Sequence, residues 1–374
     1  MLCSRNRFYV LKLGVYLLAV FIISQVLFRP RSFEKGLMNC GVEADKASLI
    51  ADYIKNNANN EIRNVVKLGP LQPRDNVVVV QVHGTDPLVF FNFTENLRNV
   101  DGIEKTLLIF SHLYYNEPIN SVIEEIRFAK VLQIFFPFNI QTCEDFFPGH
   151  SEYFCTLEPQ CRSRGSGRDA YLAQKKHFWW WTINKVFNLP DIHLRNTVLF
   201  IEDTDVFTQD LIYMLNTLKK YAHLYCRNCE LLDLGAGDLD VYNSSREDAA
   251  VKEVYRASPT KSGLALNGLV WRDLRNMGEY FCVFDDYDWR NSLQFISESA
   301  PRALLALAVI KPRVMKESTL DLESNEVLRS LFPRRLTFTT NHTDVTHTEG
   351  KGYWKDIRDR KLCLLILNMK SYDV

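Results

Sequence analysis

From residue 76 onward, short apolar segments alternate with longer segments of helical pattern. The apolar segments lie at residues 76–83, 106–111, 131–138, 197–202 and 230–235, and the helical ones at residues 87–99, 119–129 and 207–223. Apolar runs separated by helices are typical of βαβ units, in which parallel strands are buried on both faces. The pattern therefore predicts an α/β domain built on a mainly parallel sheet flanked by helices.

The amino-terminal part of the chain differs in kind from this pattern. Residues 13–28 form a nearly unbroken apolar run between basic residues, and with part of the preceding segment the run approaches the roughly 20 residues of a membrane-spanning helix. No clear small-x-small cleavage site follows, as a cleavable signal peptide would require. We predict a cytosolic tail over residues 1–12, a signal anchor over 13–28, a stem over 29–70 and a lumenal domain over 71–374.

Charge and cysteine content narrow the possible partners and the compartment. The formal net charge is zero, so no basic surface argues for nucleic acid as a partner. One of the nine cysteines, Cys3, falls in the predicted tail, which leaves an even number for an oxidising lumen. Cys226 and Cys229 fit a redox motif, half a zinc site or a small disulfide. A disulfide is favoured, because no second Cys-x-x-Cys or His pair accompanies them.

The apolar run at residues 197–202 ends in three acids, Glu202, Asp203 and Asp205. Residues i and i+2 of an extended chain point to the same side, so Asp203 and Asp205 are placed to hold one hard cation, which in turn binds a diphosphate. The rival interpretation is a solvated loop after a strand. Ligands of parallel sheets bind beyond the carboxyl ends of the strands, where these acids are expected to lie.

Six further stretches have unusual composition and a definite order. They are VVQVH at residues 79–83, IFSH at 109–112, VLQIFFPFNIQ at 131–141, the Trp triplet 179–181 after Lys176 and His177, FCVFDDYDW at 281–289 and WKDIRDRKLC at 354–363. In this order and spacing the chain resembles the Golgi α-1,6-mannosyl-glycoprotein β-1,2-N-acetylglucosaminyltransferases, the N-acetylglucosaminyltransferase II family.

The resemblance implies a GT-A glycosyltransferase fold, a UDP-N-acetylglucosamine (UDP-GlcNAc) donor, Mn²⁺ and an N-glycan acceptor on glycoproteins. It implies a type II protein of the Golgi membrane that transfers GlcNAc to the 2-hydroxyl of the α-1,6-arm mannose. It also implies disulfides between Cys226 and Cys229 and between Cys282 and Cys363. The pairing of the cysteines at 40, 143, 155 and 161 stays open, as does the oligomeric state, a homodimer included.

The metal position of the family falls on residues 202–205, where the family pattern is Glu-Glu-Asp-His and the third member binds the metal. This chain has Thr204 there, so Asp203 or Asp205 would take the role. The family's second protein ligand, a histidine, corresponds to Lys316. An ammonium group has no lone pair and repels a cation. Two interpretations follow: Asp203 and Asp205 hold Mn²⁺, or Lys316 replaces part of the metal by pairing with the diphosphate.

Transfer with inversion also needs a carboxylate that takes the proton of the acceptor hydroxyl. The family's base corresponds to Arg290, and a guanidinium cannot accept a proton near neutrality. Asp286 and Asp288 are therefore the candidate bases. Their rival role is to cap the helix that begins near Trp289.

Aromatic and basic residues are candidate substrate contacts. Indole faces suit the apolar faces of sugars, which makes Trp181 and Trp289 candidates. Three consecutive tryptophans on a helix cannot face one way, so at least one packs in the core. The basic residues 175–177 are candidates for donor phosphates or acceptor hydroxyls.

Three further histidines are candidates for functional contacts. His83 ends the first apolar run, where it is a candidate substrate contact or a structural, hydrogen-bonded histidine. His342 and His347 are candidates for a relocated metal ligand. The family's nucleotide-binding arginine, which follows the same run, has no counterpart after His83.

Departures at four functional positions leave three hypotheses. The first is an active inverting N-acetylglucosaminyltransferase. The second is a catalytically inactive or altered Golgi paralogue that binds glycan or a partner transferase. The third is a lumenal hydrolase of sugar nucleotides, which shares donor binding but uses no sugar acceptor.

Overall fold

The computed structural model describes residues 61–142, 147–149, 168–235, 248–258, 262–316, 336–340 and 347–369. The predicted cytosolic tail, the signal anchor and most of the stem lie outside these residues. Within them, no helix is both long enough and apolar enough to cross a membrane.

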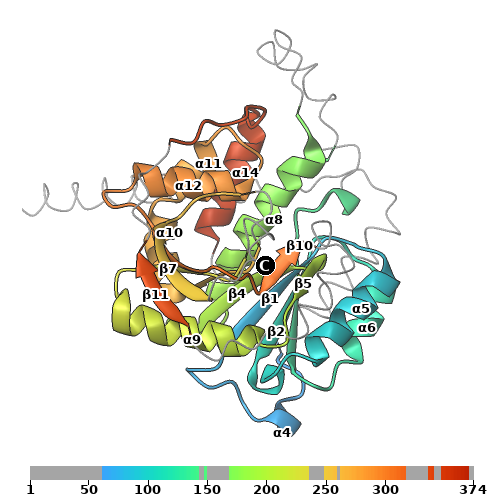
Figure 1. The fold of residues 1–374 in the computed structure, drawn as a ribbon. Coiled ribbons are helices and arrows are strands. Elements are labelled where there is room, and N and C mark those ends of the chain that lie inside the picture. Colours follow the sequence, from blue (N-terminus) through green and yellow to red (C-terminus); the bar gives the residue numbers. More distant parts are fainter. Residues whose placement is uncertain are drawn as a thin grey trace, which may run out of the picture.

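A nine-stranded mixed sheet forms the centre of the molecule (Figure 1), in the order β11-β7-β9-β6-β8-β4-β1-β2-β3. Five of its eight strand pairings are parallel and three are antiparallel, so the predicted mainly parallel sheet is confirmed. The strands are β1 (Val77–Val82), β2 (Leu107–His112), β3 (Lys130–Phe135), β4 (Thr197–Glu202), β6 (Leu231–Asp233), β7 (Ala249–Val254), β8 (Leu264–Asn267), β9 (Leu305–Val309) and β11 (Thr337–Thr340). A separate antiparallel pair joins β5 (Asp205–Phe207) to β10 (Val314–Lys316).

Helices cover both faces of the sheet (Figure 1). One face packs against α8 (Ala170–Phe187), α10 (Gly268–Asn276), α11 (Gly278–Val283), α12 (Trp289–Ser299) and α14 (Ile357–Asn368). The other packs against α5 (Pro87–Arg98), α6 (Glu117–Glu124) and α9 (Leu211–Tyr225). The remaining short helices are α4 (Val65–Leu68), η1 (Ile103–Lys105) and η2 (Ile140–Thr142).

Strand β1 shows why the sheet has this three-layer form. Val77 and Val79 pack in the core on the α8 side, whereas Val78 and Val80 pack in the core on the α5 side. Because side chains alternate along a strand, a run that is apolar at every position must be buried on both faces. The sequence of β1 therefore requires helices above and below it.

Two helices differ from the segments predicted for them. The helix predicted over residues 119–129 ends at Glu124, and the carbonyls of Ile126 and Ala129 accept hydrogen bonds from the side chain of Asn64 instead. The helix predicted from Phe207 begins at Leu211, because residues 205–207 form β5 and pair with β10.

Two disulfides link described cysteines, and both were expected. Cys282 of α11 is bonded to Cys363 of α14, and Cys226 is bonded to Cys229 in the turn after α9. The first ties together two helices that pack on the same face of the sheet. The remaining cysteines lie outside the described residues.

His112, at the end of β2, gives the fold a dependence on pH. Its ring is buried and stacks on Phe135 at 4.5 Å, and burial lowers the pKa of His112 to about 3. An unfolded histidine ionises near pH 6.5, so below that pH the unfolded chain binds a proton that the folded protein excludes. The stability contributed by neutral His112 is therefore present above pH 6.5 and is lost as the pH falls toward 3.

We expect His112→Gln to reduce this acid sensitivity. The free energy of unfolding of the wild type should fall between pH 6.5 and 4.5 by up to about 1.4 kcal/mol per pH unit more than that of the variant, as for one excluded proton. Urea denaturation at pH 7.5, 6.5, 5.5 and 4.5 measures this difference. Parallel pH profiles for the two proteins would contradict the assignment to His112.

Candidate active site

A cavity of about 420 Å³ opens at the carboxyl ends of β1 and β4. The strand order reverses at this point, since β2 and β3 follow on one side of β1 whereas β4 pairs with its other side. Open α/β sheets bind their ligands at such a reversal. The cavity volume also lies within the range of roughly 300–1,000 Å³ that is usual for small-molecule sites.

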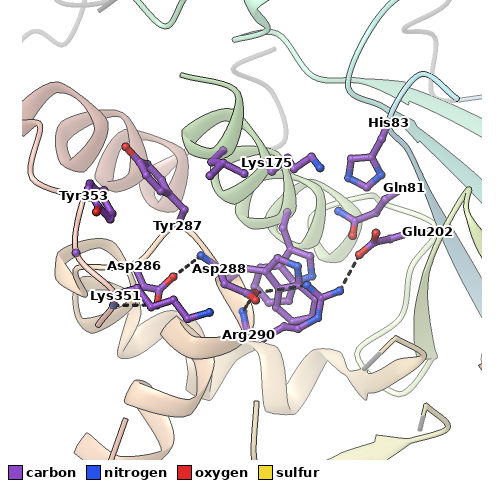
Figure 2. Close-up of a pocket in the computed structure, with 14 residues that line it drawn as sticks. Gln81, His83, Lys175, Glu202, Asp286, Tyr287, Asp288, Arg290, Lys351 and Tyr353 are labelled. Carbon is purple, nitrogen blue, oxygen red and sulfur yellow. Dashed lines mark hydrogen bonds and ion pairs between the residues drawn. The ribbon is translucent and has the colours of Figure 1, made fainter. Parts of the chain in front are cut away.

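Five parts of the chain line the cavity: the end of β1, the end of β4, one side of α8, the start of α12 and the segment before α14 (Figure 2). The lining residues are Gln81, His83, Leu172, Lys175, Trp179, Glu202, Asp286, Tyr287, Asp288, Trp289, Arg290, Lys351, Gly352 and Tyr353. Charged groups of both signs and four aromatic rings thus surround one space, as binding of a sugar and a charged group requires.

The aromatic part of the lining is a stacked pair of tryptophans. The rings of Trp179 and Trp289 lie 4.2 Å apart and are inclined by only 6°, and the Arg290 guanidinium lies 4.5 Å from the centre of the Trp289 ring. Trp181 is only 2% exposed, packs edge-on against Phe136 and does not line the cavity. Trp181 therefore does not reach the cavity as predicted. Residues two positions apart on α8 point to different sides of the helix, and Trp179 is the member that lines the cavity.

Asp286 and Asp288 both line the cavity, but their carboxylates are engaged differently (Figure 2). Asp286 is buried, with Oδ1 accepting from the backbone N–H of Asp288 and Oδ2 accepting from Asn291 Nδ2 and the backbone N–H of Lys351. Asp286 therefore organises the turn before α12. Both of its oxygens are occupied in doing so.

Asp288 is the N-cap of α12. Its Oδ1 accepts from the backbone N–H of Arg290 at 2.9 Å and lies 3.4 Å from Arg290 Nη1. Its side chain is 23% exposed, and Oδ2 takes part in none of the hydrogen bonds or ion pairs found within the described part of the chain. Among the described residues, Asp288 is thus the candidate base that lines the cavity with one carboxylate oxygen not engaged in a hydrogen bond.

Beneath this turn lies Lys176, which the sequence suggested as a contact for phosphate or hydroxyl groups. Its Nζ is buried and donates to the carbonyls of Phe284 (3.1 Å) and Asp286 (2.7 Å). Burial lowers the pKa of Lys176 well below its ordinary value, against the attraction of Asp286. Lys176 supports the turn from below, and its neighbour Lys175 is the one that lines the cavity.

His177, the third of these basic residues, also belongs to the interior. Its Nε2 lies 3.1 Å from Asp359 Oδ1, and the same carboxylate accepts from Arg168. His83, in contrast, lies at the cavity, and its predicted substrate contact stays a prediction. Its backbone N–H donates to Asp203 and its ring packs edge-on against Phe178.

The structure separates the two acids that were predicted to share a cation. Asp203 Oδ2 accepts from the backbone N–H groups of His83 (2.9 Å) and Thr85 (3.5 Å). Asp205 Oδ2 accepts from the backbone N–H of Glu202 (2.7 Å) and from Ser262 Oγ, and its Oδ1 lies 2.7 Å from Lys316 Nζ. Asp205 is thus committed to its own partners on both oxygens. Asp203 Oδ1, in contrast, has no hydrogen-bond partner within the described residues and lies 3.5 Å from His83 Nδ1.

Glu202 is the acid of this group that reaches the cavity, and it bridges two cations. Its Oε2 lies 2.7 Å from Lys316 Nζ and its Oε1 lies 2.8 Å from Arg290 Nη2 (Figure 2 shows the second contact). Burial disfavours the charged form of all three groups, but their mutual attraction outweighs it. The pKa of Glu202 is consequently lowered, and those of Lys316 and Arg290 are raised, so all three are charged at neutral pH.

A divalent metal ion does not fit this arrangement. The Lys316 ammonium lies 2.7 Å from both Glu202 and Asp205, the place between carboxylates that a cation would take. A +2 ion about 4 Å from the ammonium would be repelled by about 8 kcal/mol at an effective dielectric constant of about 20. In the ranges that the structure describes, no group of three or more His, Cys, Asp or Glu side chains could hold a metal ion. The geometry thus disagrees with a Mn²⁺ ion shared by Asp203 and Asp205.

The two remaining histidine candidates do not change this conclusion. His347 is almost fully exposed, lies 3.7 Å from Glu298 and does not line the cavity. His342 lies outside the described residues. Gln81, Lys351 and Tyr353 line the cavity without having been predicted. Gln81 is the polar residue of the VVQVH stretch, which is a local signal, whereas nothing in the sequence around Lys351 and Tyr353 distinguishes them from ordinary loop residues.

Comparisons with known proteins agree with the sequence resemblance. The family model of N-acetylglucosaminyltransferase II (MGAT2) matches residues 51–363. Human α-1,6-mannosyl-glycoprotein 2-β-N-acetylglucosaminyltransferase is 30% identical over 349 residues, which cover 82% of this chain and 76% of the human protein. The pig enzyme of the same name is 30% identical over 345 residues, which cover the same two shares.

Solved structures are more distant. That of Staphylococcus aureus TarS 1–349 in complex with UDP-GlcNAc aligns with a TM-score of 0.37 at 9% identity, over 79% of this chain and 68% of the TarS chain. This similarity is too low to assign a fold or a function. The family model, in contrast, spans most of the chain, the cavity-lining segments included. The chain therefore belongs to the N-acetylglucosaminyltransferase II family.

Proposed function

We propose that this protein is an inverting glycosyltransferase that moves GlcNAc from UDP-GlcNAc to the 2-hydroxyl of the α-1,6-arm mannose of N-glycans. Family membership supports transfer of a sugar from a nucleotide donor. The observation that carries the proposal is Asp288, which lines a cavity that also contains aromatic rings. Its Oδ1 accepts from the start of α12, while its Oδ2 takes part in no hydrogen bond within the described residues.

The reaction assigns a task to each part of the cavity. The acceptor hydroxyl oxygen bonds to the anomeric carbon of the donor as the bond from that carbon to the β-phosphate oxygen breaks, and the electron pair leaves with UDP. Asp288 takes the proton of the hydroxyl, as general-base catalysis requires. The Trp179–Trp289 stack offers an apolar wall for a sugar face. Asp286 and Lys176 hold the turn that positions Asp288.

The proposal extends to the location of the protein. Both disulfides belong to an oxidising compartment, which supports the secretory pathway. Together with the family, this supports a type II protein of the Golgi membrane, anchored through residues 13–28, with its catalytic domain in the lumen and glycoproteins as its acceptors.

A second candidate is a catalytically inactive family member that binds glycan or a partner transferase. The observation in its favour is Arg290, which stands where the family has its base and forms ion pairs with Glu202 and Asp288. It predicts that glycan or partner binding occurs without turnover.

One assay separates the candidates. The full-length protein in detergent is incubated with UDP-GlcNAc, with and without a biantennary N-glycan that has a free α-1,6-arm mannose, and both UDP and the glycan mass are measured. The proposed function predicts UDP release that depends on the acceptor, together with one added GlcNAc on the glycan. UDP release without acceptor would instead identify a sugar-nucleotide hydrolase, and absence of both products would favour the inactive relative.

A further inference from the structure

Two cations from distant parts of the chain meet on one carboxylate at the cavity. Lys316 ends β10 and Arg290 lies in the first turn of α12, yet they contact the two oxygens of Glu202 at 2.7 and 2.8 Å. The strand pairing of β10 with β5 sets Lys316 directly opposite Asp205. Both cations are therefore held by backbone elements as well as by charge.

These cations are not sealed in the interior. The side chain of Arg290 is 10% exposed and that of Lys316 is 15% exposed, and both Arg290 and Glu202 line the cavity. Arg313, three residues before Lys316, is 0% exposed and pairs with Asp210 and Asp248 inside the core. The contrast distinguishes a fully buried ion pair from Arg290, which lines the cavity, and from the partly exposed Lys316, which contacts the cavity-lining Glu202.

The charge of the pair equals that of a divalent metal ion. Lys316 and Arg290 carry +1 each, and the carboxylates around them are Glu202, Asp205 and Asp288. A divalent ion among these three carboxylates would balance two of their three negative charges. In this protein side chains supply that charge. Phosphate oxygens accept charge-assisted hydrogen bonds from guanidinium and ammonium groups alike.

We propose that Lys316 and Arg290 bind the diphosphate of the nucleotide donor in the place of a divalent metal ion, so that donor binding by this protein is independent of metal. The inference rests on the proposed function in taking a nucleoside diphosphate sugar as the ligand. When the bond between the anomeric carbon and the β-phosphate oxygen breaks, the negative charge left on that oxygen is stabilised by these two cations. The acceptor proton goes to Asp288.

Isothermal titration calorimetry with UDP as the probe tests the inference on the full-length protein. We expect UDP to bind in EDTA, with the Kd essentially unchanged when Mn²⁺ or Mg²⁺ replaces EDTA. Lys316→Gln and Arg290→Gln should each weaken binding in EDTA by about tenfold or more, as for loss of a charge-assisted contact. Lys355→Gln and Arg302→Gln serve as matched controls, because these cations are 69% and 66% exposed and pair with Asp285 and Glu230 rather than with Glu202.

A third variant is designed to make UDP binding dependent on a metal ion. Lys316→His removes the ammonium and places an imidazole beside Glu202 and Asp205, a set of ligand types that binds divalent transition metals. We expect this variant to bind UDP more tightly with Mn²⁺ than in EDTA, unlike the wild type. Thermal unfolding of each variant confirms that it is folded before titration.

Three results would overturn the inference: UDP binding by the wild type only when metal is present, no UDP binding under either condition, or unchanged binding by both glutamine variants. The proposed function fails separately. UDP binding in EDTA without transfer to any glycan would refute the transferase but would agree with diphosphate binding by Lys316 and Arg290. Transfer that requires Mn²⁺ would agree with the transferase but would refute metal-independent binding by these two cations.

Discussion

Asp288→Asn is expected to lower the rate of sugar transfer by about 10²- to 10⁴-fold, the usual contribution of a general base. An amide cannot take the proton of the acceptor hydroxyl. The substitution keeps the local structure, because asparagine caps helices as well as aspartate does and its carbonyl can accept from the backbone N–H of Arg290 as Asp288 Oδ1 does. The melting temperature should therefore stay close to that of the wild type. The kcat for acceptor-dependent UDP release and a thermal unfolding curve measure the two effects.

Two variants make this result specific. Asp86→Asn alters the N-cap of α5, whose side chain accepts from Leu88 and Val89, and should leave transfer unchanged. Asp286→Asn should lower transfer together with stability, because both oxygens of Asp286 accept hydrogen bonds and an amide offers only one acceptor. Retention of more than about a tenth of wild-type turnover by Asp288→Asn would refute its role as the base.

Arg313→Met is expected to destabilise the fold by about 3–5 kcal/mol, the usual cost of removing one partner from a buried ion pair. Arg313 is fully buried, with Nε 3.0 Å from Asp210 Oδ2 and Nη2 2.6 Å from Asp248 Oδ2. Burial disfavours its charge, but the two carboxylates outweigh burial and raise the pKa of Arg313. Without the guanidinium, two carboxylates remain in the interior with no cation between them. Urea denaturation at pH 7.5 measures the loss.

A charge-balanced variant separates lost charge from lost packing. Arg313→Met combined with Asp210→Asn and Asp248→Asn removes the cation and both anions, and should recover a large part of the stability. Arg302→Met, which removes an exposed partner of Glu230, should change stability by less than about 1 kcal/mol. A single Arg313→Met variant as stable as Arg302→Met would contradict a structural role for the buried pair.

Local patterns predicted five of the nine strands of the sheet, whereas β7, β8, β9 and β11 were not predicted. The apolar run at residues 76–83 corresponds to β1, and the helical segment at residues 87–99 corresponds to α5. Both could be predicted because their signals, the spacing of apolar residues and the N-cap Asp86, lie within a few residues of each other in the sequence. The start of α9 was predicted wrongly because it depends on a contact between distant parts of the sequence. Residues 205–207 are extended because they pair with β10, about a hundred residues later in the chain, and no local pattern records such a partner.

The Trp triplet illustrates the same division within one helix. Its position on a helix, and the conclusion that its members face different ways, follow from the sequence alone. Which member reaches the cavity depends on how α8 is rotated against the sheet. Packing in the core assigns Trp179 to the cavity and to Trp289, and Trp181 to Phe136.

The sequence alone therefore determined the α/β architecture, the family and the individual positions at which this chain departs from it, because each depends on residue type and on short-range spacing. Only the tertiary structure decided what those departures do together. Glu202, Arg290 and Lys316 come from a strand end, a helix start and a second strand pair, and their charges act on one another only when folding brings them within 3 Å. Coulomb energy depends on distance in space, which separation along the chain does not specify.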